Sequence, residues 1–182
     1  MSRDCPATLG LVPDEVDGLL AAWQRERPDL DVAPMAVLSR VSRLARHLDR
    51  ARRAAFAAHG IEAHEFDVLA ALRRAGPPYE LSPGRLLRET LVGSGTMTNR
   101  LDRLQARGLV RRHPDPSDGR RVRVRLTTAG RRRLDSAVTD LIHRERELLA
   151  GLPARERDRL ARSLAAVLDR FESGAEPGTN AR

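Results

Sequence analysis

Between residues 82 and 126 the apolar side chains change from a helical spacing to an alternating one. Ser82 followed by Pro83 predicts the start of a short helix, because a capping residue and then proline is a favoured order there. A turn through Gly93 separates this helix from a second one, which we expect Ser94 to cap. Two short helices joined by a glycine-containing turn predict a helix-turn-helix.

The segment after the second helix, which Gly108 closes, predicts a β-hairpin. Leu109 and Val110 lead the first strand, residues 113–119 form a polar tip, and Arg120 begins the second strand. Successive side chains of a strand point to opposite faces, so one face of the second strand packs and the other is basic. The packing residues are Val122, Val124 and Leu126, and the basic ones are Arg121, Arg123 and Arg125. The basic face either contacts a polyanion or is simply solvated.

Helical patterns flank this region on both sides. They span residues 14–27, 35–58 and 63–74 before it, and two further helices follow Thr127 with Thr128 and Pro153. The expected fold class is therefore mainly α (α+β), a winged helix-turn-helix lobe with a two-stranded β-wing and long terminal helices. We expect a disordered N-terminus (1–12), N-terminal helices (13–60), the winged helix-turn-helix domain (61–128), C-terminal helices (129–173) and a disordered tail (174–182).

The formal net charge of +8 and a pI near 11.3 suit a polyanionic partner. All the basic residues are arginine, and a compositional bias toward arginine would raise the pI without any DNA binding. The one cysteine, Cys5, offers no disulfide framework, and no apolar run is long enough to span a membrane. These features favour a protein of the reducing cytoplasm with no membrane partner.

The sequence offers little to support an enzyme. It has no Walker loop, no G-x-S-x-G elbow and no H-E-x-x-H pair. The histidines are scattered along the chain, so we assign neither a metal nor a cofactor: His47, His59, His64, His113 and His143.

The run SGTMTNRLDRLQARGLVRRHPDPSDGRRVRVRLTTAG resembles the recognition helix, wing and following helix of the MarR family of transcription regulators. The resemblance covers roughly residues 14–172. It implies a homodimer with interdigitated terminal helices, which binds a pseudo-palindromic operator in double-stranded DNA. Two such lobes meet successive major grooves when their recognition helices lie ~34–36 Å apart.

The polar face of the expected recognition helix carries short groups able to meet base edges and thymine methyls, namely Thr96, Thr98 and Asn99. Arg103 is expected to contact phosphate. Asp118 and Arg120 match the Asp-x-Arg tip of the family's wing, which implies that the arginine enters the minor groove and that the aspartate orients it. Arg121 is a further candidate for contact with DNA.

The helix at residues 14–27 is similar to one found in the MarR subgroup that responds to urate and related anions. The resemblance implies a ligand site made of Trp23, Asp67, Arg100 and Arg112, of which the last three lie in FDVLAAL, TNRLDRL and GLVRRHPDP. Two guanidinium groups suit a flat monoanion, and a Trp ring offers a stacking surface. Repulsion between Asp67 and the anion would push on the helix that carries Arg100.

Simpler interpretations stay open. Asp67 and Arg100 fit an internal ion pair, and Trp23 fits a core anchor. Urate is the leading effector, but a xanthine-type purine, trans-aconitate or another small carboxylate would also suit two arginines. An architectural DNA-binding protein without an effector would carry the same wing.

Overall fold

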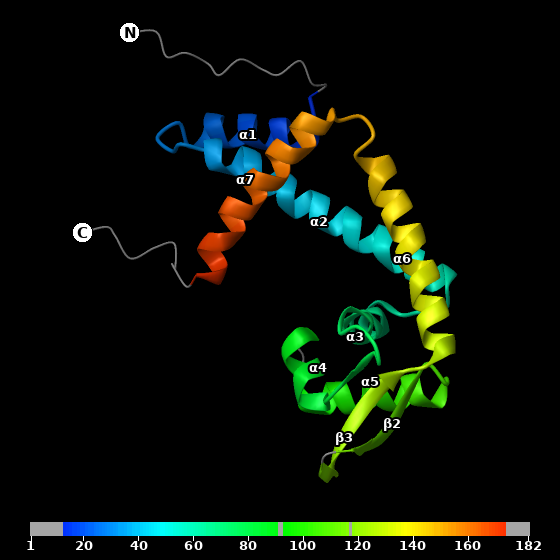
Figure 1. The fold of residues 1–182 in the computed structure, drawn as a ribbon. Coiled ribbons are helices and arrows are strands. Elements are labelled where there is room, and N and C mark those ends of the chain that lie inside the picture. Colours follow the sequence, from blue (N-terminus) through cyan, green and yellow to red (C-terminus); the bar gives the residue numbers. More distant parts are fainter. Residues whose placement is uncertain (1–12, 91–92, 117, 174–182) are drawn as a thin grey trace, which may run out of the picture. The chain divides into compact units, whose positions relative to one another are not determined.

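The computed structural model describes residues 13–90, 93–116 and 118–173 (Figure 1). Its helices are α1 (Glu15–Glu26), α2 (Ala33–Ala58), α3 (Ala63–Arg74), α4 (Pro83–Thr90), α5 (Ser94–Ala106), α6 (Thr128–Leu148) and α7 (Ala154–Glu172). The strands are β1 (Glu80–Leu81), β2 (Val110–Asp115) and β3 (Asp118–Leu126). The chain divides into two compact units within α2, one ending at Ala54 and the other beginning at Ala55. Cys5 and the expected disordered ends lie outside the described residues.

In the first unit, Asp14 caps helix α1. Its carboxylate accepts hydrogen bonds from the backbone N–H groups of Val16 (2.8 Å) and Asp17 (3.2 Å), and Asp17 accepts one from the Asp14 N–H at 2.8 Å. This reciprocal arrangement is a capping box. Arg40 of α2 then joins the two helices by ion pairs to Asp14 (2.9 Å) and Asp17 (2.7 Å).

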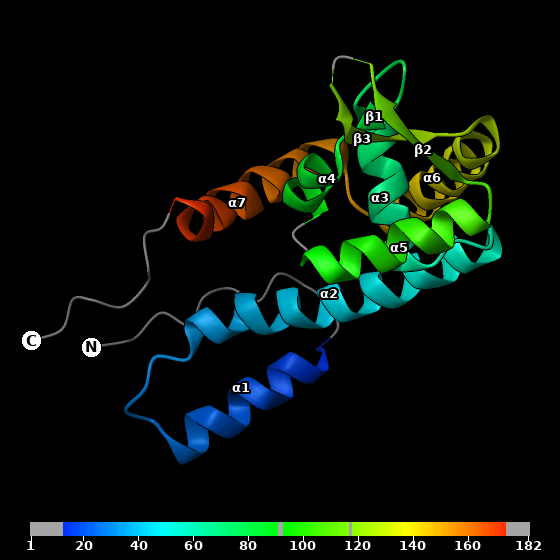
Figure 2. The same ribbon diagram turned by 90° about the horizontal axis from the view of Figure 1, so that it is seen from below.

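The second unit holds the hydrophobic core, which α3, α4, α5, α6 and the sheet enclose (Figures 1 and 2). Leucines supply most of its fully buried large side chains, among them Leu69, Leu72, Leu86, Leu104 and Leu134. The helical spacing had predicted these elements, and the mainly α class with a winged helix-turn-helix is confirmed. One expected detail is wrong, because Gly93 and not Ser94 is the N-cap residue of α5. Gly93 has the extended backbone that an N-cap requires, and glycine is tolerated there.

The sheet is antiparallel with strand order β1-β3-β2, so it contains one strand more than the expected two-stranded wing. Strand β1 consists of Glu80 and Leu81 alone, which is too short for any alternation to predict. The hairpin tip is also shorter than expected, since β2 runs to Asp115 and β3 already begins at Asp118. Because β2 is an edge strand, it tolerates Pro114, and a register shift follows between Pro114 and Asp115.

Two glycines fix the junction of the wing with its neighbouring helices. Gly108 follows α5 with φ +69°, a conformation that side chains with a Cβ rarely adopt. Gly130 lies in the first turn of α6, where a Cβ would come within 2.1 Å of the Leu109 carbonyl oxygen. The start of β2 and the start of α6 therefore pack backbone against backbone.

Helix α7 has no buried residue. Its large apolar side chains are exposed, with Leu160 at 41%, Leu164 at 40%, Val167 at 41%, Leu168 at 54% and Phe171 at 66%. Such a row along one helix is unusual for a surface that meets only water. No helix among the described residues is both long and apolar enough to cross a membrane.

Candidate DNA-binding surface and ligand site

Helix α5 presents the polar face that the sequence predicted. Met97, Leu101 and Leu104 are buried in the core of the second unit. The candidate base-reading and phosphate-contacting residues on the other side are all exposed: Thr96, Thr98, Asn99 and Arg103. The helix is thus held by one face and leaves the other accessible to a groove of DNA.

At the wing tip, Asp118 holds its neighbours in two ways. One carboxylate oxygen accepts a hydrogen bond from the backbone N–H of Arg120 at 3.1 Å, and the other pairs with the guanidinium of Arg121 at 3.1 Å. The Arg120 side chain is exposed and has no ion pair among the described residues. Asp118 therefore orients Arg120 through its backbone, and its side-chain partner is Arg121.

Two arginines on the basic face of β3 have partners within the protein, which the alternation did not predict. Arg123 pairs at 2.6 Å with Asp115, whose side chain is 7% exposed, and Arg125 donates to the Pro78 carbonyl oxygen at 3.0 Å. Val122, which was expected to pack, is 43% exposed. It lies toward the tip, opposite Pro114 of the edge strand.

Arg112 ties the wing to the candidate recognition helix. Its Nη1 pairs with Oδ1 of Asp102 at 2.5 Å, and its Nη2 donates to the backbone carbonyl of Thr98 at 3.4 Å. Both partners belong to α5, whereas Arg112 belongs to β2. The sequence analysis named Arg112 but not Asp102. Asp102 follows Thr98 by one helical turn and so lies on the same face of α5, which could have identified it as a partner.

Arg100 carries a buried polar atom without a partner. Among the described residues, its Nη1 is the one buried side-chain nitrogen or oxygen that makes no hydrogen bond. A buried donor of this kind costs free energy, and in native proteins it usually has a partner. It therefore marks a position where an acceptor would be favourable.

Among the described residues of the second unit, no hydrogen bond or ion pair joins Asp67, Arg100 and Arg112 to one another. Asp67 is exposed and lines a cavity of about 190 Å³ with Arg74, Glu89 and Thr90. No ion pair between Asp67 and Arg100 exists in the described part of the chain, so the internal-pair interpretation finds no support. Trp23 is 44% exposed on α1 in the first unit, which is not the burial of a core anchor.

A partly buried ion pair that the sequence did not predict fixes the end of α5. Nη1 of Arg107, the C-cap residue of α5, contacts both carboxylate oxygens of Glu65 at 2.5 and 2.6 Å, and Nη2 contacts the Gly60 carbonyl. The Glu65 side chain is 3% exposed. Burial raises the pKa of this carboxyl, but hydrogen bonds from Arg107 and the Glu62 backbone outweigh it and hold the pKa below 4.5.

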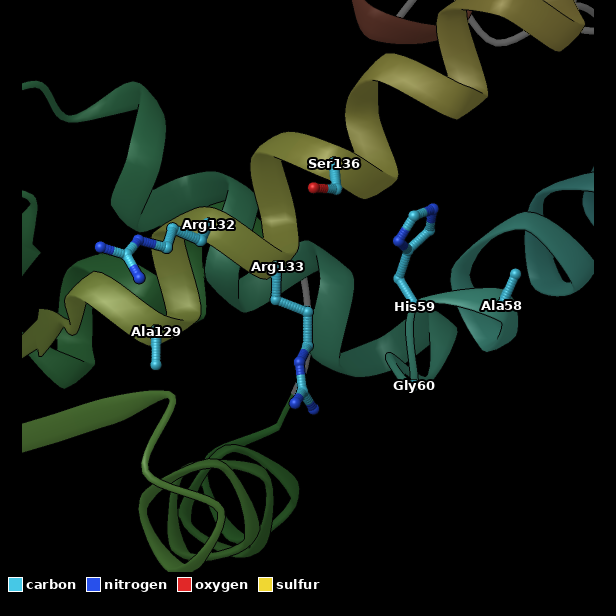
Figure 3. A pocket seen from close by; sticks show the side chains of 7 residues that line it. All are labelled: Ala58, His59, Gly60, Ala129, Arg132, Arg133 and Ser136. Carbon is cyan, nitrogen blue, oxygen red and sulfur yellow. The ribbon is translucent and has the colours of Figure 1, made fainter.

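A cavity of about 620 Å³ lies between the end of α2 and the first turns of α6 (Figure 3). Its lining consists of Ala58, His59, Gly60, Ala129, Arg132, Arg133 and Ser136, none of which the sequence singled out as a site residue. The two arginine heads point in different directions in Figure 3. His59 instead binds Asp140 of α6 at 2.6 Å, so this region serves mainly to join the two helices.

These elements define a winged helix-turn-helix protein, with an exposed polar recognition helix and a basic wing. A model of the MarR family matches residues 59–121. The regulator PecS of Dickeya dadantii is 38% identical over 84% of this chain and 92% of its own length. The chain therefore belongs to the MarR family, whose members are transcriptional regulators that bind operator DNA and are not enzymes.

Two solved structures of relatives concern DNA binding and its regulation. A cysteine-to-serine mutant of Escherichia coli MarR in complex with operator DNA matches with a TM-score of 0.61 and 29% identity, over 80% of this chain and 97% of that one. BpsR of Bordetella bronchiseptica, whose DNA binding 6-hydroxynicotinic acid regulates, matches with a TM-score of 0.55 and 28% identity, over 71% and 93%.

Proposed function

We propose that this protein is a dimeric repressor that leaves its operator when urate or a related small anion binds. Membership of the MarR family supports the DNA-binding part of the proposal. The effector part depends chiefly on one observation, the buried and unpartnered Nη1 of Arg100 on the helix that is expected to read DNA.

On the DNA side, α5 enters the major groove and its exposed Thr96, Thr98 and Asn99 meet base edges. Arg103 contacts phosphate, and the exposed Arg120 at the wing tip reaches the minor groove. Arg121 contributes less than Arg120, because Asp118 already pairs with its guanidinium. Since several phosphates are neutralised, the affinity falls steeply as the salt concentration rises.

On the ligand side, the anion accepts hydrogen bonds from the Arg100 and Arg112 guanidinium groups. Nη1 of Arg100 gains an acceptor that it does not have among the described residues. Arg112 must exchange Asp102 and the Thr98 carbonyl for the anion, since these occupy its Nη1 and Nη2. Asp67 and Trp23 complete the proposed site, Asp67 by repelling the anion and Trp23 by stacking.

Release from DNA follows from this exchange. Thr98 belongs both to the base-reading face and to the contact with Arg112, so withdrawing Arg112 changes the support of α5 at the residue that meets DNA. A ligand shifts an equilibrium only by its differential affinity for the two states. The DNA-bound arrangement, in which Arg112 stays on α5, must therefore bind the anion poorly.

Exposed apolar side chains support the homodimer. Besides the row on α7, α6 exposes Ile142 (49%) and Leu148 (60%). Helix α2 exposes Val37, Leu38, Val41 and Leu44, between 39% and 57%. Obligate interfaces between subunits are enriched in such residues, and a second copy of this chain is the partner that the family implies.

A mobility-shift titration of the full-length protein on the DNA upstream of its own gene tests the proposal. We expect urate to release the DNA, with xanthine, trans-aconitate and 6-hydroxynicotinate as parallel arms that rank the effectors. A protein that binds this DNA tightly in the presence of every anion would be an architectural protein and not a ligand-controlled repressor. Light scattering of the free protein reports whether it is a dimer.

A further inference from the structure

A cavity of about 610 Å³ lies on the face of the sheet that is turned away from α5. Its lining comes from the segment before β1, from β2 and β3, and from the first turn of α6: Pro77, Pro78, Tyr79, Arg111, Arg125, Leu126, Thr127, Thr128 and Arg131. The volume falls within the ~300–1,000 Å³ range of small-molecule sites. Three arginines and no acidic residue line it.

This cavity is separate from the proposed effector site. Neighbouring residues of a strand point to opposite faces, so Arg111 faces the cavity while Arg112 reaches α5. Neither Asp67 nor Arg100 lines it. It is equally distinct from the cavity beside His59, which shares none of its lining residues.

The arginines are brought together against their mutual repulsion. Arg111 and Arg125 lie directly opposite each other in the antiparallel register of β2 and β3, where like charges are destabilising. Glu80 lies 3.8 Å from Arg125 and partly offsets that charge, although it also contacts His113 at 3.2 Å. Among the described residues, no carboxylate pairs with Arg111 or Arg131.

Arg131 is held in place without being neutralised. Its guanidinium carbon lies 5.5 Å from the centroid of the Tyr79 ring, on which Arg73 also stacks at 5.0 Å. Arg73 has its own carboxylate, Asp135, at 2.9 Å, whereas no carboxylate of the described segments pairs with Arg131. A cation–π contact orients a cation but leaves its charge available for an anion.

We propose that this cavity binds a small organic anion with at least two acidic groups, either carboxylates or phosphates. Arg111 and Arg131 have no carboxylate partner among the described residues, and Glu80 only partly offsets the charge of Arg125. Their combined positive charge is more than a single carboxylate would neutralise. Arg111 stands four residues before Asp115, which at ~3.3 Å per residue is about 13 Å from the hairpin tip. This distance from the DNA-contacting tip favours a small anion over a phosphate of the operator.

Calorimetric titration of the full-length protein at constant ionic strength tests the site, with citrate and inorganic pyrophosphate as probes and acetate as the single-charge comparison. We expect citrate or pyrophosphate to bind, and the one that binds identifies carboxylate or phosphate as the preferred group. Arg111→Ala and Arg131→Ala each weaken this binding about 10-fold or more, because each removes a charged hydrogen-bond donor. Arg132→Ala removes the same charge from the next position of α6, outside the cavity, and leaves the binding unchanged.

Three results would overturn the proposal. The first is that neither probe binds at millimolar concentration, and the second is that Arg132→Ala weakens binding as much as Arg131→Ala does. The third is that Arg111→Ala lowers the affinity for the operator and its salt dependence but leaves anion binding unaltered, which would make the arginine cluster a contact to DNA phosphate. The release of DNA by urate is measured by mobility shift and binding at this cavity by calorimetry. A failure of the proposed function and a failure of this site are therefore distinguishable.

Discussion

Arg112 of strand β2 and Asp102 of helix α5 form an ion pair of 2.5 Å that couples the wing to the recognition helix. The pair is accessible, with the two side chains 29% and 55% exposed, so its worth to stability is only about 0–1 kcal/mol. Its importance lies instead in where Arg112 is held. The same guanidinium donates to the Thr98 carbonyl, so Arg112 would have to leave both partners on α5 to bind the proposed anion.

Asp102→Asn is expected to make the repressor more sensitive to its effector. The substitution removes the charge that competes with the anion for Arg112, so half-release from the operator needs several-fold less urate. The measurement is a urate titration of the protein–operator complex by fluorescence anisotropy. Arg112→Ala is the companion variant, and we expect it to remain on DNA at all urate concentrations. A fully responsive Arg112→Ala protein would remove that residue from the site.

Arg100→Met is expected to abolish the response to urate without lowering stability. The variant replaces a buried donor, which has no acceptor among the described residues, with a shorter and flexible apolar side chain, and an unsatisfied donor costs about 1–3 kcal/mol. Chemical denaturation without ligand should therefore give an equal or higher free energy of unfolding. A loss of more than about 1 kcal/mol would mean that Arg100 has a structural role in the free protein.

Arg120→Ala is expected to weaken operator binding by about 1–3 kcal/mol, because it removes the proposed groove contact at the wing tip. The slope of log affinity against log salt concentration should fall by about one phosphate contact if the side chain also neutralises phosphate. Arg155→Ala, an exposed change of the same charge on α7, is the control. Equal effects of the two substitutions would assign the change to net charge and not to the tip.

The recognition helix shows how far the sequence determines this fold. Met97, Leu101 and Leu104 recur at helical spacing, and the structure buries all three, because a periodic apolar stripe has one stable orientation toward a core. Capping residues and turn glycines predicted most element boundaries, because they act on the backbone of their immediate neighbours. Strand β1 could not be predicted, because its two residues form a strand only by pairing with Arg125 and Val124, which lie far along the chain.

The candidate site was less accessible to sequence reasoning. Arg112 and Arg100 were named from a motif, but the pairing of Arg112 with Asp102 and the burial of the Arg100 Nη1 depend on tertiary packing. Glu65 and Arg107 are separated by 42 positions, so no local spacing links them. Charged residues on helices are mostly exposed, so the sequence alone predicts a solvated position for both of them.

The Glu65–Arg107 pair is expected to make the protein less stable in acid. The folded-state pKa of Glu65 lies below its ordinary value of 4.5, so the unfolded chain binds the proton more readily. The stabilisation is therefore present above pH 4.5 and is lost as the pH falls through the lower folded-state value. Glu65→Gln should lower the free energy of unfolding by about 1–3 kcal/mol at neutral pH, because Arg107 is partly exposed, and should flatten its dependence on pH below 4.5. Glu147→Gln, at an exposed position of α6, should retain the wild-type profile.

Gly130→Ala is expected to separate helix α6 from the base of the wing. The added Cβ would lie 2.1 Å from the Leu109 carbonyl oxygen and 2.9 Å from its carbonyl carbon, and these backbone atoms cannot rotate away as a side chain would. The Gly130 N–H donates to Thr127 Oγ1 at 3.0 Å, so the first turn of α6 is already fixed by its cap. We expect a loss of about 3 kcal/mol in the free energy of unfolding, measured by chemical denaturation.

Gly84→Ala is the matched control for this substitution. Gly84 lies inside α4 with nothing within 4 Å of the added Cβ, and alanine is the better helix former by about 1 kcal/mol. This variant should therefore be as stable as the wild type or more so. If Gly130→Ala were equally harmless, α6 would have to shift away from Leu109. The anion cavity, which Arg131 and Leu126 help to line, would then change shape, so citrate and pyrophosphate titrations of the same variant report on that shift.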